Sequence, residues 1–394
     1  MTKSSPFSLY VHVPFCAHKC PYCDFNTYAT PRLPEADYVE ALSKELRRFG
    51  LDPRFRGREI ATVFFGGGTP SLLSAEAVSS ILRAASEQFP IVVGAEITLE
   101  ANPGDVTCEK LQAFSDAGVN RLSYGVQSFD DERLKLLGRD HTAQQAIDAV
   151  SMARQVGIAN ISVDIIFGTP GQTLADLERD VHAAASLPIA HLSTYSLTIE
   201  PGTPFFQRQE RGLLVMPGDS LVAQMLERLP EIASGCGFAR YEISNYARDG
   251  KESAHNNVYW TGGDYLGVGA GAHSYVATWR DGVLVAGDRW STVALPQTYI
   301  RDAGSSRVTS WSEKIEKSSL WFEFFYVGLR RISGVSASEF QKRFDVSLWD
   351  TYGDVARDLE GEGFLLIDEN RISLTKRGVA VADSVFERFV QPTP

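Results

Sequence analysis

The sequence predicts an α/β fold in which parallel strands alternate with helices and build a partial (β/α)6 barrel of the TIM type. Two observations lead to this prediction. β-rich runs and helical patterns alternate through the first half of the chain, as they do where helical crossovers join parallel strands into a doubly wound sheet or a barrel. Glycine and polar residues follow most of these runs, at the end of the strand where barrels carry their chemistry. Six such units are too few to close an eight-stranded barrel.

The six predicted strands are rich in β-branched and aromatic residues and end in turn-forming or polar residues. They span residues 8–13, 61–65, 96–101, 121–125, 160–167 and 191–198. Between them, apolar residues recur at helical spacing. The helices predicted from this spacing cover residues 33–49, 74–89, 108–117, 131–137, 142–156 and 174–185. Ser74 and Glu76 provide a helix start signal, and Gly118 closes a helix.

The alternation stops after Pro217, so we expect three parts in the chain. A core of residues 1–217 forms the partial barrel, an extension of residues 218–303 covers it, and residues 304–394 form a small C-terminal α+β module. The extension opens with an amphipathic helix at residues 220–234, and residues 305–317 are expected to be a polar connection.

The C-terminal module resembles a winged helix. Its predicted elements are helices at residues 320–331, 336–344 and 350–362 and a hairpin of residues 364–367 and 371–375. Winged helices often bind DNA. No concentrated basic face is visible in this part of the sequence, so we expect a packing or partner-binding role.

Composition narrows the classes of function. The chain has 394 residues, 44% hydrophobic and 22% charged, and a net charge of −11, which disfavours attraction to nucleic acids or anionic lipids. No secretory signal and no apolar run of about 18 residues is visible. We therefore expect no nucleic-acid partner and no membrane span, with peripheral association through partner proteins left open. A reducing cytoplasm suits the free thiols.

Three cysteines lie on the loop that follows the first predicted strand, in the order Cys16-Ala-His-Lys-Cys20-Pro-Tyr-Cys23. Thiolates are soft ligands that suit iron–sulfur clusters. A cubane cluster has four irons, so three cysteines leave one iron open to a ligand that is not a protein side chain. The spacing therefore predicts a [4Fe-4S] cluster with one open position.

Two other interpretations of the cysteines are weaker. A structural zinc site needs four ligands, and the remaining cysteines, Cys108 and Cys236, are far away in sequence. A disulfide framework is not expected either, because five cysteines are few and odd in number for a chain of this length.

The cysteine spacing identifies the chain as a member of the radical SAM superfamily, and the resemblance covers essentially its whole length. Within that superfamily the chain resembles oxygen-independent coproporphyrinogen III dehydrogenase and its relatives. The segments that carry this resemblance are Tyr10-Val-His-Val-Pro-Phe-Cys16, Pro21-Tyr-Cys-Asp-Phe25, Gly66-Gly-Gly-Thr-Pro-Ser71, Glu100-Ala-Asn-Pro103, Gly125-Val-Gln-Ser-Phe129 and Asp164-Ile-Ile-Phe-Gly168.

The resemblance implies that S-adenosylmethionine (SAM) chelates the open iron, and it assigns residues by motif. Tyr10, Tyr22, Gly67 and Glu100 would contact the cluster-bound SAM. A second list, Gly68, Thr69, Gln127, Arg139 and Asp164, would surround an adjacent pocket that the dehydrogenase uses for a second SAM. An electron donor such as a flavodoxin or ferredoxin would reduce the cluster, and whether SAM is then cleaved stays open.

Two departures from the dehydrogenase point to a different branch. The dehydrogenase has a further cysteine where this chain has Phe25, and its N-terminal extension is longer than the segment before residue 8 here. Both features resemble the heme chaperone branch, HemW. That branch is also marked by a His-Asn-x-x-Tyr-Trp segment, which stands here as His255-Asn-Asn-Val-Tyr-Trp260.

Membership in the heme chaperone branch implies that the protein binds heme and delivers it to heme-accepting apo-proteins of respiration. His255 is a candidate heme ligand, because imidazole is a common axial ligand of heme iron and the adjacent aromatic rings could pack on a porphyrin. The segment also fits a polar turn that covers the end of the barrel. The alternative function is radical oxidative decarboxylation of coproporphyrinogen III.

Overall fold

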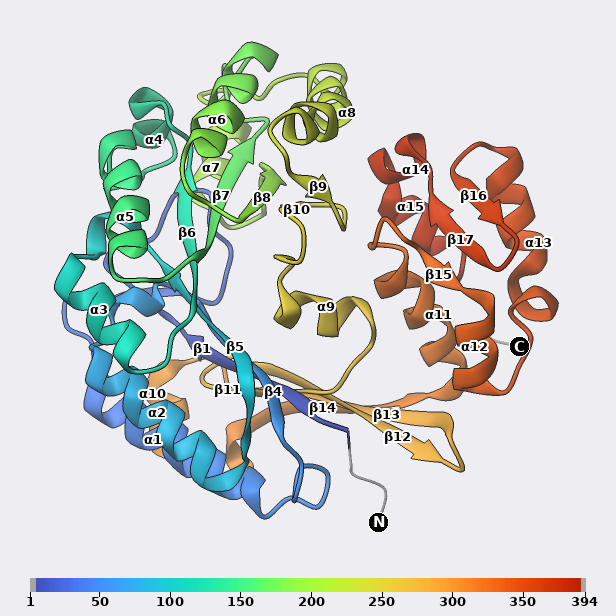
Figure 1. Cartoon of the computed structure of the whole chain (residues 1–394), viewed down its shortest axis with the longest axis horizontal. Coiled ribbons are helices and arrows are strands. Elements are labelled where there is room, and N and C mark those ends of the chain that lie inside the picture. Colours follow the sequence, from blue (N-terminus) through green and yellow to red (C-terminus); the bar gives the residue numbers. More distant parts are fainter. Residues whose placement is uncertain (1–4, 391–394) are drawn as a thin grey trace.

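The computed structural model of the chain describes residues 5–390. One twelve-stranded sheet curves through the molecule in the order β14-β13-β12-β11-β1-β4-β5-β6-β7-β8-β10-β9, and helices cover its outer face (Figure 1). A separate small module, coloured orange to red, lies beside the open side of the curved sheet. The architecture is the mixed α/β fold that the sequence predicts, with an unclosed barrel.

The six predicted strands are all present and form the parallel centre of the sheet. They are β1 (Phe7–Val13), β4 (Ile60–Gly67), β5 (Ile91–Ala101), β6 (Arg121–Gln127), β7 (Asn160–Phe167) and β8 (His191–Ser196). At the edge of this group β1 pairs in parallel with β11 and not with β8. The barrel therefore stays open, because β1 and β8 do not meet.

The predicted crossover helices are also present, shifted by one or two residues at their ends. They are α1 (Glu35–Gly50), α2 (Ala75–Gln88), α3 (Cys108–Asp116), α4 (Asp131–Leu136), α5 (Ala143–Gln155) and α6 (Leu174–Ser186). Local sequence explains where several begin: Ser74 caps α2 by accepting the Ala77 amide, and Thr142 and Thr173 form capping boxes.

The main hydrophobic core lies between the outer face of the sheet and these helices, and it includes Leu9, Val11 and Val63. Successive residues of a strand point to opposite faces. The residues between these apolar positions, such as Tyr10 and Thr62, consequently point into the barrel. This alternation places polar side chains in the interior of the barrel.

Four strands extend the sheet beyond β1: β11 (Tyr265–Val268), β12 (His273–Arg280), β13 (Val283–Thr292) and β14 (Thr309–Glu316). The prediction of a polar connection at residues 305–317 is wrong, because β14 pairs antiparallel with β13 there. β14 is an edge strand with mostly exposed side chains. Edge strands are often polar and charged, so the apolar alternation that would reveal this strand is missing.

Between β11 and β12 the backbone packs closely against the barrel. A Cβ atom on Gly269 would lie 2.4 Å from the carbonyl oxygen of His12, and the residue has a φ of +105°. Only glycine tolerates both the contact and the conformation. The glycine-rich segment therefore joins the extension tightly to β1.

The remaining elements of the core and extension are short or join longer ones. They are β2 (Phe15–Cys16), β3 (Tyr28–Ala29), α7 (Pro204–Glu210), α8 (Asp219–Gly235), β9 (Ala239–Arg240), β10 (Asn245–Ala247), α9 (Ala254–Trp260) and α10 (Pro296–Asp302), with 3-10 turns at Pro70–Leu72, Pro103–Asp105 and Ser306–Val308. In α9, the segment at His255, for which a polar turn was the alternative interpretation, is a helix capped by Ser253.

The C-terminal module contains α11 (Lys317–Gly328), β15 (Val335–Ser336), α12 (Ala337–Phe344), α13 (Leu348–Gly361), β16 (Leu365–Asp368), β17 (Arg371–Leu374), α14 (Lys376–Ala380) and α15 (Ala382–Glu387). Aromatic side chains fill its core, where Phe325 stacks on Phe389 at 4.2 Å between ring centroids. The same core includes Tyr275 and Leu284 of the extension, so the two parts pack together. The exact domain boundaries stay a prediction.

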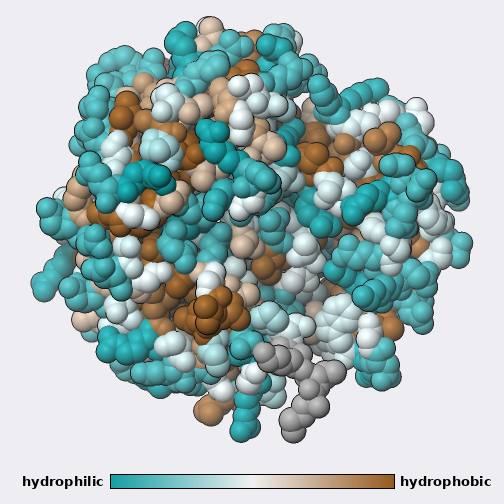
Figure 2. Space-filling view, viewed as in Figure 1, coloured by the Kyte–Doolittle hydropathy of each residue, from teal (hydrophilic) through white to brown (hydrophobic). Residues whose placement is uncertain are grey.

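On the face seen in Figure 2, no single large hydrophobic patch dominates the surface. Hydrophobic residues there form small groups among hydrophilic ones. Among residues 5–390, no helix combines the length and the apolar character that crossing a membrane requires.

Candidate functional site

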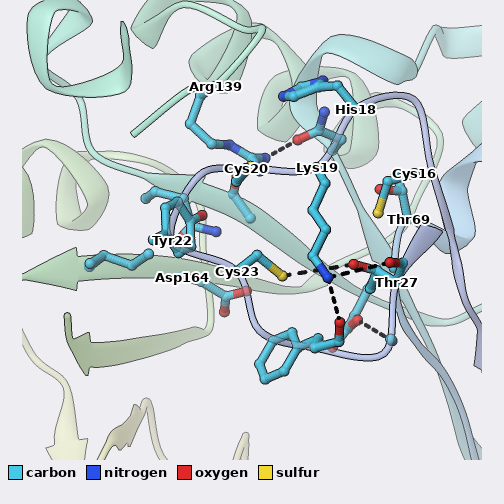
Figure 3. A pocket seen from close by; sticks show the side chains of 18 of the residues that line it. Cys16, His18, Lys19, Cys20, Tyr22, Cys23, Thr27, Thr69, Arg139 and Asp164 are labelled. Atoms are coloured by element: carbon cyan, nitrogen blue, oxygen red, sulfur yellow. Dashed lines mark hydrogen bonds between the residues drawn. The ribbon is translucent and has the colours of Figure 1, made fainter. Parts of the chain in front are cut away.

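The three cysteines of the predicted cluster loop line one cavity of about 490 Å³, which we call the outer cavity. The loop leaves β2 at Cys16 and returns through β3, which pairs parallel with β2. Cys16, Cys20 and Cys23 are free thiols, partly buried, and lie around one opening (Figure 3).

The donor set at this loop fits an iron–sulfur cluster. Burial raises the pKa of the Cys16 thiol, and hydrogen bonds from Thr69 and Thr27 act in the opposite direction by favouring its thiolate. In the part of the chain that the structure describes, no three His, Cys, Asp or Glu side chains converge on a point that one metal ion could occupy. The three cysteines line one cavity, and thiolates are the soft ligands that hold iron–sulfur clusters.

The cysteine loop is tied to the segment that follows α4. Arg139 donates from Nη1 to the sulfur of Cys20 at 3.4 Å and from Nη2 to the carbonyl oxygen of Gly125 at 2.8 Å and to Asn102. His18 is engaged by the same segment, with Nε2 2.7 Å from the carbonyl oxygen of Gly138. These contacts hold the loop at a fixed position relative to β6.

The Gly66-Gly67-Gly68 segment at the end of β4 forms a flat backbone edge along the outer cavity. A Cβ atom on Gly67 would lie 2.4 Å from the His12 ring, and one on Gly68 would lie 2.5 Å from the carbonyl oxygen of Phe15. Side chains are therefore excluded at both positions. The adjacent Thr69 lines the same cavity, so a ligand can approach this edge closely.

Two carboxyl groups lie at the bottom of the outer cavity. Burial and, next, the nearby Asp164 raise the pKa of Glu100 to about 7, and burial raises that of Asp164 to about 6. Glu100 accepts the amide of Gly67 at 3.0 Å. Near neutral pH both carboxyl groups can gain or lose a proton, and a cationic ligand would favour their ionised forms.

Gln127 ends β6 with a φ of +72° and lines the outer cavity. Positive φ is uncommon for a residue other than glycine and often marks a functional position. Tyr22 also lines this cavity and packs against Phe205. The structure thus brings most of the predicted SAM residues together around the cysteines.

Tyr10 and His255 lie elsewhere, in a second cavity of about 210 Å³ inside the barrel, which we call the inner chamber. His255 projects into it from α9 and is 1% exposed. Its Nδ1 lies 2.7 Å from the Thr62 hydroxyl and its Nε2 lies 2.9 Å from the Tyr259 hydroxyl. Both ring nitrogens are therefore engaged.

The inner chamber meets the outer cavity at four residues that line both: Glu100, Ser123, Asp164 and Tyr195. Sequence reasoning assigned no role to Tyr195 at the end of β8 or to Asn102, which bridges Arg139 and Asp140. Asn102 lies in one of the segments that carry the family resemblance, so the sequence could have marked it as a site residue. For Tyr195 the only indication in the sequence was its position near the end of a strand.

Known proteins resemble this chain in both sequence and fold. The sequence model of the radical SAM superfamily matches residues 10–184, and that of the HemN C-terminal domain matches residues 315–381. Among solved structures, coproporphyrinogen III oxidase (HemN) from Escherichia coli aligns with a TM-score of 0.82 at 22% identity, over 98% of this chain and 90% of its own. At this low sequence identity, the similarity to HemN shows a shared fold and nothing further.

Curated relatives match over most or all of their length. The heme chaperone HemW of Lactococcus lactis is 37% identical over 98% of this chain and 97% of its own. HemW of Escherichia coli K12 is 36% identical over 99% of this chain and 100% of its own. The mitochondrial radical S-adenosyl methionine domain-containing protein 1 of Bos taurus is 35% identical over 96% of this chain and 86% of its own.

The contact between Arg139 and Cys20 predicts an effect on a cluster held by the three cysteines. Hydrogen bonds to cluster sulfurs are among the factors that set the reduction potential. Replacing Arg139→Gln removes a charge-assisted bond of about 1.5 kcal/mol, which corresponds to a drop of roughly 60 mV for a one-electron couple. An EPR-monitored redox titration of the reconstituted protein measures this shift.

The control for Arg139→Gln is its iron and sulfide content, which should equal that of the unaltered protein. A variant with full cluster content and an unchanged potential would contradict the predicted role of the N–H···S bond.

Proposed function

The chain belongs to the HemW family of heme chaperones within the radical SAM superfamily, and from this membership we propose that it is itself a heme chaperone. It binds heme and delivers it to apo-proteins that depend on heme, among them respiratory proteins. The observation that carries the proposal is that the likeness to HemW spans 97% of the Lactococcus lactis protein and 100% of the Escherichia coli protein. It therefore includes the extension with α9 as well as the barrel.

As a radical SAM protein the chain uses a [4Fe-4S] cluster and SAM. We propose that Cys16, Cys20 and Cys23 hold the cluster and that SAM completes the ligands of its fourth iron. When bound and reduced, the cluster supplies the electron that can cleave the sulfonium of SAM. A flavodoxin or a ferredoxin is the proposed electron donor. The proposed location is the cytoplasm, whose reducing conditions suit the free cysteines.

The outer cavity is the proposed SAM site, and its volume of about 490 Å³ lies in the usual range for small-molecule sites. The residues proposed to contact SAM from its walls are Tyr22, Gly67, Gly68, Thr69, Glu100, Gln127, Arg139 and Asp164. Tyr10 would act from the inner chamber, next to Glu100. Backbone at the glycine edge can receive the adenosine, while the two carboxyl groups suit the ammonium group.

The raised pKa of Glu100 predicts a pH dependence of SAM binding. Burial raises this pKa to about 7, and protonation removes the charge that attracts the ammonium group. SAM affinity should therefore fall as the pH decreases through 7, by roughly eightfold between pH 7.5 and pH 6. Isothermal titration calorimetry of the reconstituted protein with SAM measures the SAM affinity at each pH.

Glu100→Gln is the matched control, because it keeps the shape of the side chain without the titrating group. This variant should bind SAM weakly at every pH in the range. An equally steep pH dependence in Glu100→Gln would exclude Glu100 as the cause.

His255 is the proposed heme ligand, and its surroundings set a condition for that role. Its Nε2 lies 2.9 Å from the Tyr259 hydroxyl, so the hydroxyl must move before the nitrogen can reach iron. Burial, and next the nearby Arg121, lower the pKa of His255 to about 3. The ring is therefore neutral, which is the form that binds a metal.

Two variants separate ligation by His255 from a packing role. His255→Ala should weaken heme binding by roughly tenfold or more and shift the Soret band, while the cluster spectrum stays unchanged. Tyr259→Phe frees Nε2 and should preserve or strengthen heme binding. Equal losses in both variants, with unchanged Soret spectra, would instead indicate that the hydrogen bond stabilises the fold.

The proposed function is tested by offering the anaerobically reconstituted protein heme or coproporphyrinogen III in the presence of SAM. We expect heme uptake followed by transfer to an apo-hemoprotein, which is followed through the acceptor's absorption spectrum. Coproporphyrinogen III should be recovered unchanged, because the residue two positions after Cys23 is Phe25, where the dehydrogenase has cysteine. Formation of protoporphyrinogen would overturn the chaperone assignment.

A further inference from the structure

Gln127, at the end of β6, has a backbone conformation that the surrounding structure must hold in place. Its φ is +72°, in a region that residues other than glycine enter only at a cost in free energy. β6 also carries one extra residue relative to β7 between Tyr124 and Gln127, where the register of the pairing shifts. Such a β-bulge redirects a side chain and often lies next to a functional site.

This conformation places the side chain of Gln127 at the wall of the outer cavity. A Cβ atom on Gly125 would lie 3.0 Å from Nε2 of Gln127 and 3.5 Å from Nη2 of Arg139. The amide therefore lies near the guanidinium that donates to the sulfur of Cys20 at 3.4 Å. An amide offers both donors and an acceptor, so Gln127 can form hydrogen bonds with a ligand beside the cysteine loop.

Asp180 holds the backbone directly after Gln127. This residue of α6 is 3% exposed. Its Oδ1 accepts the amide of Phe129 at 2.7 Å, and the hydroxyl of Ser128 donates to the carboxylate, 3.1 Å from Oδ1 and 2.9 Å from Oδ2. The oxygen of Ser128 in turn accepts the amide of Asp130 at 3.1 Å. One buried carboxyl group thus fixes the turn that follows Gln127.

Asp180 acts on a ligand only through this turn, because it is not among the described residues that line the outer cavity or the inner chamber. Phe129 is 51 positions away in sequence, so the contact ties α6 to the end of β6. Both carboxylate oxygens act as acceptors here, whereas an amide in the same place would have a donor in one of the two positions. The turn therefore favours an aspartate at this point of α6.

We propose that Asp180 is a positioning residue for SAM binding. It holds the turn of Ser128 and Phe129, so that Gln127 keeps its left-handed conformation and its amide stays at the outer cavity. This inference rests on the proposed SAM site and adds to it a residue that does not touch the ligand. Without the carboxyl group, Gln127 relaxes to a negative φ, and its amide turns away from SAM.

The test is a double-mutant cycle on SAM affinity, measured by isothermal titration calorimetry with the reconstituted full-length protein. Gln127→Ala removes one hydrogen bond to SAM and should weaken binding roughly fivefold. Asp180→Ala should cause a loss of similar size, and the double variant should bind SAM no more weakly than either single variant. Asp180→Asn keeps an oxygen that can accept the Phe129 amide, so it should retain most of the affinity.

Asp176→Ala is the matched control. Asp176 lies one turn earlier in α6 and also accepts a backbone amide and a hydroxyl, both from Thr173, at 2.7 and 2.8 Å. Asp176→Ala should lower the thermal midpoint of unfolding, as Asp180→Ala should, but leave SAM affinity unchanged. The difference in SAM affinity between the two variants separates positioning of Gln127 from a general effect on stability.

Independent losses in the cycle, or full SAM affinity in Asp180→Ala, would overturn the positioning role. Unchanged affinity in Gln127→Ala would remove both residues from the SAM site. If Asp180→Ala does not fold, Ser128→Ala replaces it, because this change removes only one hydrogen bond of the turn. Its smaller loss should likewise disappear in the Gln127→Ala background, and a loss that persists there would overturn the role. Failure of the unaltered protein to bind SAM would instead overturn the proposed SAM site itself.

Discussion

The arrangement of this protein depends on one geometric constraint: a parallel strand turns every second side chain toward the inside of the curved sheet. In β6 and β7 this places Leu122 and Val163 in the apolar core outside and Ser123 and Asp164 inside. Polar groups are costly to bury alone, so they satisfy one another, as in the contact of 2.7 Å between Thr62 and His255. The two cavities are the spaces that these pairs leave unfilled.

The open barrel follows from which strand pairs at each edge. β1 pairs with β11, so β1 and β8 do not meet, and the extension supplies α9 to cover the interior. His255 enters the barrel from this helix and contacts side chains of β4. The segment characteristic of the heme chaperone family is therefore part of the barrel's interior wall, next to Glu100 and Asp164, which also line the proposed SAM site.

Burial gives the same interior its chemical character. Carboxyl groups without full ion pairs have raised pKa values, as Glu100 does at about 7, and imidazoles lose their charge, as His255 does. A cationic ligand in the outer cavity would favour the ionised forms of these two carboxyl groups, Glu100 and Asp164.

The sequence by itself determined the elements and the cluster loop, because strand alternation, helix caps and the spacing of Cys16, Cys20 and Cys23 are local features. It missed β14, whose polar edge position erases the usual pattern, and it gave no sign that the charged side chain of Arg121 is buried inside the barrel. Only the tertiary structure decided which residues meet: His18 and Gly138, 120 positions apart, are in hydrogen-bond contact, and Tyr10 lies with His255 inside the barrel, not with the cysteines. Such contacts depend on the register and curvature of strands distant in sequence, which short-range patterns do not specify.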